Sequence, residues 1–478
     1  MEKLPDTIEE CHKIIRLLQV ALSDLSKQVE TLSKRVETLE AENRDLKERL
    51  NGNTSNSSLP PSKDIKKKRR SNGRKPSGKQ SGGQPGHKGY YRELLASEAV
   101  DSIEECVLPK QCVCGGEIGI TGEYLRHQVY ELPKLKLQVT EYQLEKGCCE
   151  NCRTNQIASL PEGISWGITG PRLTSFMSEL VTKYGLSRRE QQRFLKEQLD
   201  FELSLGTVFN KQKVVNAALE APVSELLPIV KESNSVYVDE TGHNHDGKSQ
   251  WLWGIVSMTA GYFSIEASRG KKVLKDMLSD FKHTIISDRY SAYEYFDSIQ
   301  RQLCWAHVKR DFTKLSEKED KTIARIGKEL LENEGELFKI WHEFKSEQIS
   351  REELLKKAKP IRQRVGELLE QGSYTAPELK ASRMCKNLLK NFYALWTFLE
   401  TEGVEPTNNH AERSLRPLVI WRKKYFCTRS DYGSEYVARS ASIQATCKLQ
   451  GKSSFNFLCE AMHNHFSGKQ TSILSIMA

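Results

Sequence analysis

Apolar positions at the start of the chain follow a strict seven-residue repeat. From Ile15 onward, one series recurs every seven positions with Asn43 as its polar member, and a second series of leucines begins at Leu18. This spacing predicts a coiled-coil helix over residues 1–52, and valines in the first series with leucines in the second favour a parallel pair. We therefore expect a homodimer or higher oligomer. The alternative is a single amphipathic helix packed on the rest of the protein.

The periodicity ends abruptly, and residues 53–92 are rich in Gly, Ser, Pro, Lys and Arg. Such a composition cannot bury enough apolar surface to fold, so we expect a flexible basic linker. A run of cations within it has few acids nearby and can displace counterions from a phosphate backbone, which predicts salt-dependent affinity for DNA. These cations are Lys66, Lys67, Lys68, Arg69 and Arg70.

Two cysteine-rich stretches follow, "KQCVCGGEIG" and "KGCCENCRTN", and the alternating pattern between them predicts strands over residues 126–144. Two such knuckles joined by a β segment are typical of a zinc ribbon, which we predict over residues 93–165 as a DNA-binding module. Four thiolates leave no open coordination position, so the zinc would be structural. Cys148 can substitute for one ligand, and thiols that bind no metal are the alternative. The predicted ligands are Cys112, Cys114, Cys149 and Cys152.

Residues 166–230 show helical patterns, and a Ser-Gly turn before one of the helices resembles the junction of a helix-turn-helix unit. If this region reads DNA, the helix after the turn would supply the groove or phosphate contacts. A helical bundle with a structural role is the alternative. The candidate contact residues are Thr207, Asn210, Lys211 and Lys213.

Residues 231–307 predict three strands, a helix and a fourth strand. The first strand is expected to end at Asp239 and Glu240, and the fourth at Asp288. This order is that of a ribonuclease H-like core, in which the first and fourth strands lie side by side and parallel. We therefore expect Asp239 and Asp288 to lie close together.

Two neighbouring carboxylates repel each other unless cations lie between them, and Mg²⁺ needs few protein ligands. Two Mg²⁺ ions, or Mn²⁺, can activate an attacking oxygen and stabilise the leaving one in phosphodiester chemistry. The expected third carboxylate is Glu412 in "NNHAERSLR", which follows a long helical stretch. The alternative is a solvated i,i+4 pair with Arg416. The residues expected to orient Glu412 or touch phosphate are Asn409, Arg413 and Arg416.

A basic strip follows Glu412 along the chain and is interleaved with aromatic residues. Cations next to aromatic rings suit phosphate contact and base stacking, although an ordinary amphipathic surface has the same pattern. The candidate DNA-binding cations are Arg422, Lys423 and Lys424.

Length and charge agree with these assignments. With 478 residues and a formal net charge of +9, we expect a multidomain α+β protein with a polyanionic partner. Twelve cysteines in so long a chain do not indicate a disulfide scaffold and suit a reducing cytosol. We find no apolar run near the roughly 18 residues of a spanning helix and no secretory leader, so we expect a cytoplasmic bacterial protein without a membrane partner.

Several stretches occur in one order along the chain: "NSSLPPSKD", "GGQPGHKG", "VDET" with "WLWG", "SDRYSAY", "CWAHVKRDF" and "NNHAERSLRPLVIWRKKYFCTRSDYGSE". Together with the cysteine knuckles, they resemble the transposases of the insertion sequence 66 family, a branch of the DDE transposases with a ribonuclease H-like core. The resemblance implies a catalytic triad of Asp239, Asp288 and Glu412. A helical insertion over residues 308–400, before the last acid, is implied as well, so that residues 401–478 form the last part of the core. It also implies that the terminal inverted repeats of the element and target DNA are the substrates, and that accessory proteins of the same element assist.

In the implied reaction, phosphodiester cleavage at the element end frees a 3′ hydroxyl, which then attacks target DNA. In related transposases with a helical insertion, a Cys-x-x-His element follows the second Asp. The resemblance thus gives Cys304 and His307 a supporting part, although two ligands alone make a poor metal site and a buried Cys with a hydrogen-bonded His is the alternative. A dimeric DNA-binding regulator and a nuclease that cuts without joining are the alternative functions.

Overall fold

The computed structural model describes residues 7–51, 83, 86–89, 91–375 and 380–477. The predicted mixture of helices and sheet in an α+β protein is confirmed, since sixteen helices and seven strands occur in these ranges. The basic run predicted to bind DNA, residues 66–70, lies outside the described residues. Within the described ranges, no helix combines the length and the hydropathy that crossing a membrane requires.

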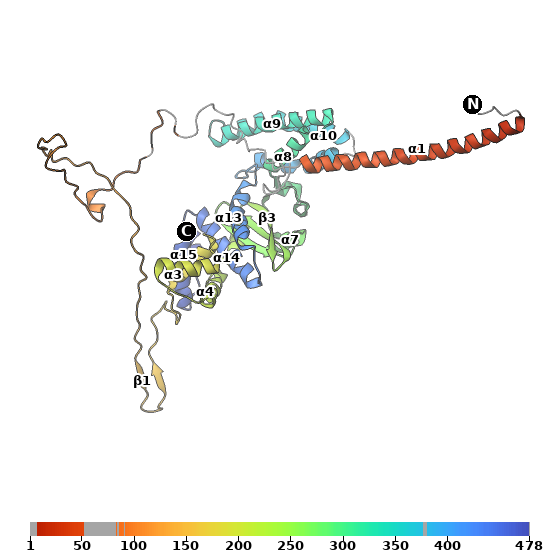
Figure 1. Ribbon diagram of the computed structural model, residues 1–478. Coiled ribbons are helices and arrows are strands. Elements are labelled where there is room, and N and C mark those ends of the chain that lie inside the picture. Colours follow the sequence, from red (N-terminus) through yellow and green to blue (C-terminus); the bar gives the residue numbers. More distant parts are fainter. Residues whose placement is uncertain (1–6, 52–82, 84–85, 90, 376–379, 478) are drawn as a thin grey trace.

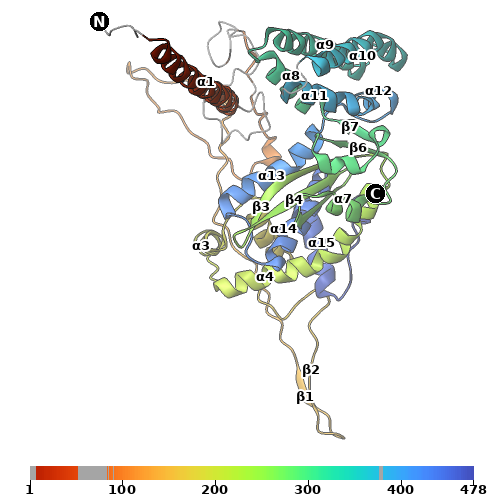
Figure 2. The same ribbon diagram turned by 90° about the vertical axis from the view of Figure 1, so that its right-hand side faces the viewer.

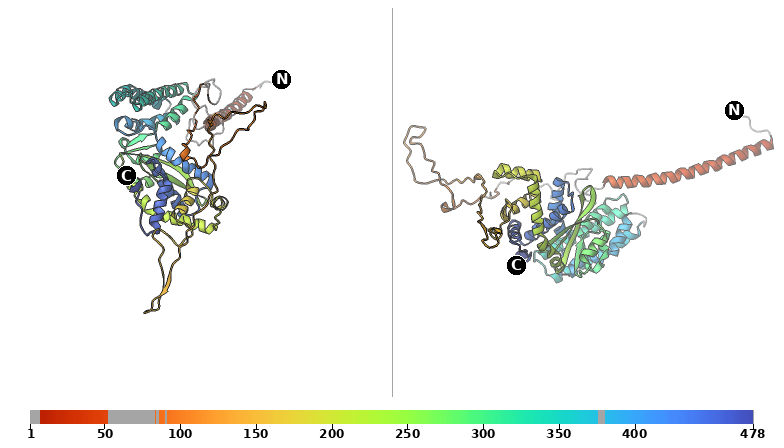
Figure 3. Two further views of the ribbon diagram at one scale, coloured as in Figure 1. Left: turned by 90° about the vertical axis from the view of Figure 1, so that its left-hand side faces the viewer. Right: turned by 90° about the horizontal axis from the view of Figure 1, so that it is seen from below.

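The N-terminal repeat forms a single helix, α1 (Ile8–Asn51), which projects away from the rest of the protein (Figures 1 and 3). Its leucines face solvent: the side chain of Leu25 is 58% exposed and that of Leu32 is 61% exposed. The helix predicted for this region is confirmed. An apolar stripe that the rest of the chain does not cover agrees with a pairing surface and argues against a helix packed on the body.

The cysteine region is largely irregular. Residues 126–144, for which we predicted strands, contain none, and the regular pairing is limited to a short antiparallel hairpin of β1 (Lys146–Cys148) and β2 (Asn155–Ile157). The hairpin lies at the tip of an arm that extends from the body (Figure 2). The strand prediction was wrong because alternation alone cannot make a strand: no neighbouring segment pairs with this backbone, and side chains such as Val139 stay exposed.

Three predicted helices follow as α2 (Pro171–Thr182), α3 (Arg188–Leu199) and α4 (Leu205–Ala218). Local signals set their ends. Gly185 adopts a positive φ of 69° after α2, Ser187 and Glu190 form a reciprocal capping box at the start of α3, and Ser204 caps α4. Two short helices, α5 (Glu220–Ser224) and α6 (Leu226–Lys231), then lead into the sheet.

The central sheet has the strand order β5-β4-β3-β6-β7. Strand β3 pairs antiparallel with β4 and parallel with β6, and β6 pairs parallel with β7, so the predicted adjacency of the first and fourth strands is confirmed. The crossover from β5 to β6 runs through helix α7 (Lys271–Leu278). The strand bounds are β3 Ser235–His245, β4 Lys248–Val256, β5 Gly261–Glu266, β6 Thr284–Ser287 and β7 Arg301–Leu303.

Strand β3 is longer than predicted. It continues beyond Asp239 to His245, because its second half pairs with the first half of β4 as a two-stranded ribbon that turns at Asp246 and Gly247. Asp239 therefore lies within the strand at the level where β6 ends, not at the end of β3.

Helices cover the sheet and form two apolar clusters. One cluster joins the sheet to α7, α13, α14 and α15, and the other joins the β6–β7 end to the helices α8 to α12 (Figure 2). The helix bounds are α8 Trp305–Ser316, α9 Lys321–Lys345, α10 Arg351–Tyr374, α11 Lys380–Lys390, α12 Thr397–Glu400, α13 Asn409–Tyr425, α14 Asp431–Leu449, α15 Ser454–Phe466 and α16 Leu474–Met477. Short 3₁₀ turns occur at Ser97–Ala99, Ser291–Tyr295, Ser298–Gln300 and Tyr393–Leu395.

The close crossing of α8 and α9 gives a test of this packing. A Cβ atom at Gly327 of α9 would lie 2.6 Å from the carbonyl carbon of Leu315, whereas one at Gly335 of the same helix would meet nothing within 4 Å. We expect Gly327→Ala to destabilise the protein by about 1–3 kcal/mol through overpacking. Gly335→Ala, the matched control, should stabilise it by up to about 1 kcal/mol. Thermal unfolding followed by circular dichroism measures both effects, and equal melting temperatures for the two variants would contradict the packing.

Candidate active site

Strand pairing brings Asp239 and Asp288 together. The parallel register of β3 with β6 matches Tyr237 with Ile286, so two residues further on Asp239 lies level with Asp288. Neighbouring strands are about 4.8 Å apart. The two carboxylates therefore leave adjacent backbones at the carboxyl end of β6.

Helix α13 brings Glu412 to the same place. Asn408, directly before the helix, donates from its side chain to the carbonyl oxygen of Val238 at 2.9 Å, and its backbone N–H donates to Cys304 Sγ at 3.1 Å. These bonds hold the start of the helix against the residue that precedes Asp239. Glu412 lies in the first turn, with its side chain 35% exposed.

The three acids lie close enough for their charges to interact, although their carboxylate oxygens do not all come within 4.8 Å of one another among the described residues. Burial raises the pKa of Asp239 well above its ordinary value of 3.8, and the nearby charges of Glu240, Asp288 and Glu412 raise it further. Glu412 Oε1 is buried and has no hydrogen-bond partner in the part of the chain that the structure describes. Carboxylates that are crowded and incompletely satisfied suit a bound cation, which would neutralise the repulsion and occupy the free oxygen.

Glu240, the next residue along β3, has a different environment. Alternation along the strand directs it to the opposite face, where its side chain is 1% exposed and receives hydrogen bonds from Arg269 Nε at 2.6 Å and from the Tyr293 hydroxyl. The Arg269 guanidinium also lies 3.8 Å from the ring centre of Tyr290. Glu240 is thus a paired structural acid, and the sequence analysis did not identify its partners.

A pocket of about 290 Å³ opens beside Asp288. One of its arginines, Arg289, pairs with Asp311 at 2.5 Å, whereas Arg310 makes no hydrogen bond or ion pair with any residue that the structure describes. An arginine without a protein partner next to crowded acids suits a phosphate group. The pocket is lined by Arg269, Asp288, Arg289, Tyr290, His307, Arg310 and Asp311.

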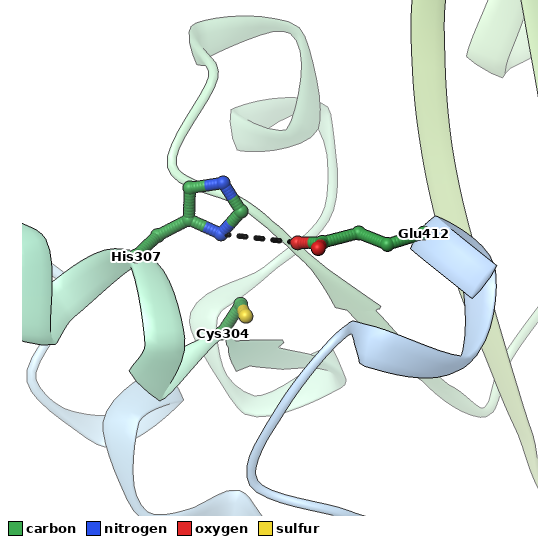
Figure 4. Close-up of side chains that lie close together, drawn as sticks. All are labelled: Cys304, His307 and Glu412. Carbon is green, nitrogen blue, oxygen red and sulfur yellow. Dashed lines mark ion pairs between the residues drawn. The ribbon is translucent and has the colours of Figure 1, made fainter. Parts of the chain in front are cut away.

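Cys304 and His307 also lie at this site. Cys304 is buried and precedes α8, and His307 is one turn into that helix. His307 Nδ1 lies 3.8 Å from Glu412 Oε1, and the three side chains point toward one another (Figure 4). The Cys-x-x-His pair, which we considered a poor metal site by itself, thus acquires a third donor.

The other residues predicted to support Glu412 lie on the same helix, and the described structure shows no hydrogen bond or ion pair from them to the Glu412 side chain. The backbone carbonyl of Asn409 accepts a hydrogen bond from Arg413 Nε at 3.2 Å, and Arg413 and Arg416 are exposed. No ion pair within 4 Å links Glu412 to Arg416, both of which are described residues, so the solvated pair that we considered as an alternative is absent.

The basic strip on α13 is only partly exposed. Arg422 is half-buried and donates to the hydroxyl of Thr241 at 2.8 Å and to the carbonyl oxygen of Gly242, which fastens the helix to β3. Lys423 and Lys424 are exposed. These two lysines are thus better placed for a phosphate contact than Arg422.

The predicted zinc ligands form two separate pairs. Hydrogen bonds from the Gly116 backbone and then from Cys112 lower the pKa of Cys114. Hydrogen bonds from Thr154 and then from Cys149 lower the pKa of Cys152 to about 7. Among the described residues, the four thiols do not lie together as one group of metal-ligating atoms. Cys304, His307 and Glu412 do form such a group. Each knuckle favours thiolate, and the ribbon stays a prediction.

The helix-turn-helix candidates lie on α4. The side chain of Thr207 hydrogen-bonds Ser204 at the helix start, Asn210 is exposed, and the ammonium of Lys213 lies 5.1 Å from the ring centre of Phe209. Lys211 is partly buried, which lowers its pKa. Asn210 and Lys213 are therefore the more accessible of the four.

Comparison with known proteins identifies the family of this chain. The family model described as "Transposase IS66 family" matches residues 167–436, which is more than half of the chain and runs from before α2 into the first turns of α14. The chain belongs to this transposase family. Membership implies DNA as a partner and, for a DDE-type enzyme, a divalent metal. A second model, for a family of unknown function, matches residues 5–93, which include α1.

Two relatives of this family member are uncharacterized proteins of Sinorhizobium fredii. The protein y4hP is 25% identical over 383 residues, which cover 71% of this chain and 68% of that protein. The protein y4qI is 25% identical over 331 residues, which cover 63% of this chain and 60% of that protein.

The raised pKa of Asp239 predicts a pH effect on stability. At pH values between the ordinary pKa of 3.8 and the raised pKa, Asp239 keeps a proton in the folded protein and releases it in the unfolded chain. The contribution of Asp239 to stability is therefore lost as pH rises through this range. Without divalent metal, we expect Asp239→Asn to melt at a higher temperature than the wild type at neutral pH. As pH rises from about 4, its melting temperature should fall less than that of the wild type. Thermal unfolding in a chelator measures this. The exposed turn variant Asp246→Asn should follow the wild type, and an Asp239→Asn curve identical to it would contradict the burial of this charge.

Proposed function

We propose that this transposase is a DDE enzyme of an insertion sequence that cleaves DNA at the element ends and joins them to target DNA. The observation that carries the proposal is the convergence of Asp239, Asp288 and Glu412 from two parallel strands and one helix. The alternative of a non-catalytic DNA-binding regulator gives no reason for three acids to share a site. A nuclease that never joins has the same acids and is separated from a transposase by experiment.

The strand order supports a ribonuclease H-like core. The core would comprise residues 231–307 and 401–478, with the helical segment 308–400 as an insertion between them. The ends of this insertion meet: the backbone N–H of Trp305 donates to the carbonyl oxygen of Pro406 at 2.9 Å. Because the two ends of the insertion adjoin, the length of the insertion does not change where Glu412 lies.

We infer that Asp239, Asp288 and Glu412 hold two Mg²⁺ ions, with Mn²⁺ as a substitute. The fit rests on the raised pKa of Asp239 and on the unpartnered Oε1 of Glu412. When bound, such ions supply activation of the attacking oxygen and stabilisation of the leaving one. No covalent intermediate with the protein is required.

The chain's own residues would position the DNA. Arg310 has its guanidinium available in the pocket beside Asp288 and would bind a phosphate next to the bond that breaks. Arg269 is held by Glu240, so it adds positive charge without moving. Arg413, Arg416 and the exposed lysines of α13 would contact the backbone further along the strand.

Recognition of the terminal inverted repeats would fall to the N-terminal half. The basic linker of residues 53–92 would supply salt-dependent affinity, and a zinc ribbon over residues 93–165 and the helices of residues 166–230 would supply contacts with the repeats. The paired thiols with lowered pKa in the knuckles support a structural Zn²⁺.

Helix α1 would join two copies so that both element ends are held together. The exposed leucines along its length support this role, and accessory proteins of the same element would assist the assembly.

Asp239→Asn tests the catalytic proposal. We expect it to abolish both cleavage and strand transfer with Mg²⁺ while binding of terminal-repeat DNA is retained, because the substitution removes a metal ligand and not a DNA contact. Gel assays of cleavage, and of joining with precut ends, measure the two steps. Asp246→Asn should be fully active. Cleavage retained by Asp239→Asn would refute the triad, and wild-type cleavage without joining would identify a nuclease.

Leu32→Asp tests the coiled coil. A charge in the apolar stripe of α1 should shift the full-length protein from dimer or higher oligomer toward monomer in sedimentation or light scattering. Thr31→Asp adds the same charge one residue away, outside the heptad stripe, and should leave the mass unchanged. A wild-type protein that is monomeric, or two variants with the same mass, would contradict the pairing.

A further inference from the structure

Three different metal-binding groups meet beside the acidic site. The sulfur of Cys304, a ring nitrogen of His307 and a carboxylate oxygen of Glu412 all lie within 4.8 Å of one another. They come from the junction of β7 with α8, from α8 itself and from the first turn of α13 (Figure 4). No other set of three such groups this close together occurs in the described part of the chain.

Two of the atoms in this cluster have no hydrogen-bond partner among the residues that the structure describes. His307 Nδ1 and Glu412 Oε1 are both buried and unpaired, and their separation of 3.8 Å is too long for a hydrogen bond. Leaving buried polar atoms unpaired is costly, and native proteins satisfy nearly all of them. A cation between these two atoms would satisfy both at once.

The donor set selects the kind of cation. Thiolate and imidazole bind Zn²⁺ and related borderline-soft ions, whereas Mg²⁺ prefers oxygen alone. With zinc bonds of about 2.0 to 2.3 Å, ligand atoms in a tetrahedral site are roughly 3.3 to 3.8 Å apart. Small side-chain adjustments would reach this spacing, and water would take the fourth position.

We propose that Cys304, His307 and Glu412 form a site for a borderline-soft divalent cation such as Zn²⁺, and that filling this site inhibits the transposase. On binding, the Cys304 thiol gives its proton to solvent and its sulfur bonds the metal. The site exists independently of the proposed function; only the inhibition rests on it.

Inhibition follows from sharing one carboxylate. Glu412 is the third acid of the proposed magnesium centre, and its charge is one of those that raise the pKa of Asp239. A soft cation on the Cys304 side would neutralise Glu412 and direct its oxygen toward His307, which weakens its hold on magnesium. The same acid thus belongs to two sites of opposite ligand preference.

Binding is tested with Co²⁺, which replaces Zn²⁺ and absorbs light when bound to thiolate. The test uses a full-length variant in which serine replaces the knuckle cysteines, so that the predicted ribbon does not contribute to the absorption. We expect one equivalent of Co²⁺ to give a thiolate absorption band in this variant. Adding Cys304→Ser, or His307→Gln at a partly exposed position, should weaken or remove the band. Cys385→Ser, which removes another fully buried thiol, is the matched control and should keep the band. The knuckle residues replaced are Cys112, Cys114, Cys148, Cys149 and Cys152.

A missing band, or one that persists in both Cys304→Ser and His307→Gln, would overturn the site. Zn²⁺ should also raise the melting temperature of the Cys385→Ser protein and not that of the two site variants, which separates lost binding from lost folding.

In the activity arm, Zn²⁺ at one equivalent should slow Mg²⁺-dependent cleavage several-fold in the Cys385→Ser protein, and His307→Gln should remove that sensitivity. Equal sensitivity in both proteins would overturn the inhibition. Failure of the proposed function would instead appear as no cleavage at all in Mg²⁺, with the cobalt band unaffected.

Discussion

The parallel pairing of β3 with β6 is the constraint on which the site depends. Their register places two aspartates from distant parts of the chain at one level, and the alternation of side chains along β3 sends neighbouring acids to opposite faces. Val236 and Val238 belong to one apolar cluster and Tyr237 to the other, so the strand is buried on both faces before it reaches Asp239. Burial on both sides fixes the register, because a shift of one residue would exchange the two faces.

The two acids on β3 show how environment separates structural from chemical roles. Glu240 is buried against Arg269 and Tyr293, which neutralise and hydrogen-bond it. Burial still raises the pKa of Glu240, and burial together with the charges of Glu240, Asp288 and Glu412 raises the pKa of Asp239 well above its ordinary value. A buried acid crowded by other carboxylates is destabilising unless a cation binds it, which supports the proposed magnesium site.

The position of Glu412 depends on hydrogen bonds around Asn408. One bond joins this residue to β3 and another joins it to Cys304 after β7, so the start of α13 is tied to both halves of the sheet. The helices from α8 to α12 have their own apolar cluster and return the chain to its starting point. The third acid is therefore placed by local contacts at the two ends of the insertion, despite the long stretch of chain within it.

The sequence by itself determined the elements and most of the candidate acids. Heptads predicted α1, a Ser-Gly turn marked the start of α4, and the order of strands predicted which of them are adjacent. These features are local or follow from a known order of elements, so periodicity and spacing reveal them. The same alternation misled at residues 126–144, where no partner strand is present.

Only the tertiary structure decided which side chains share an environment. It paired Glu240 with Arg269, tied Arg422 to β3, left Arg310 without a partner among the described residues and brought Glu412 to 3.8 Å from His307. Each of these relations joins residues that are not neighbours in sequence, and their energies depend on distance and burial in three dimensions. A motif can indicate that a carboxylate is important, but its pKa and its partners come from the fold around it.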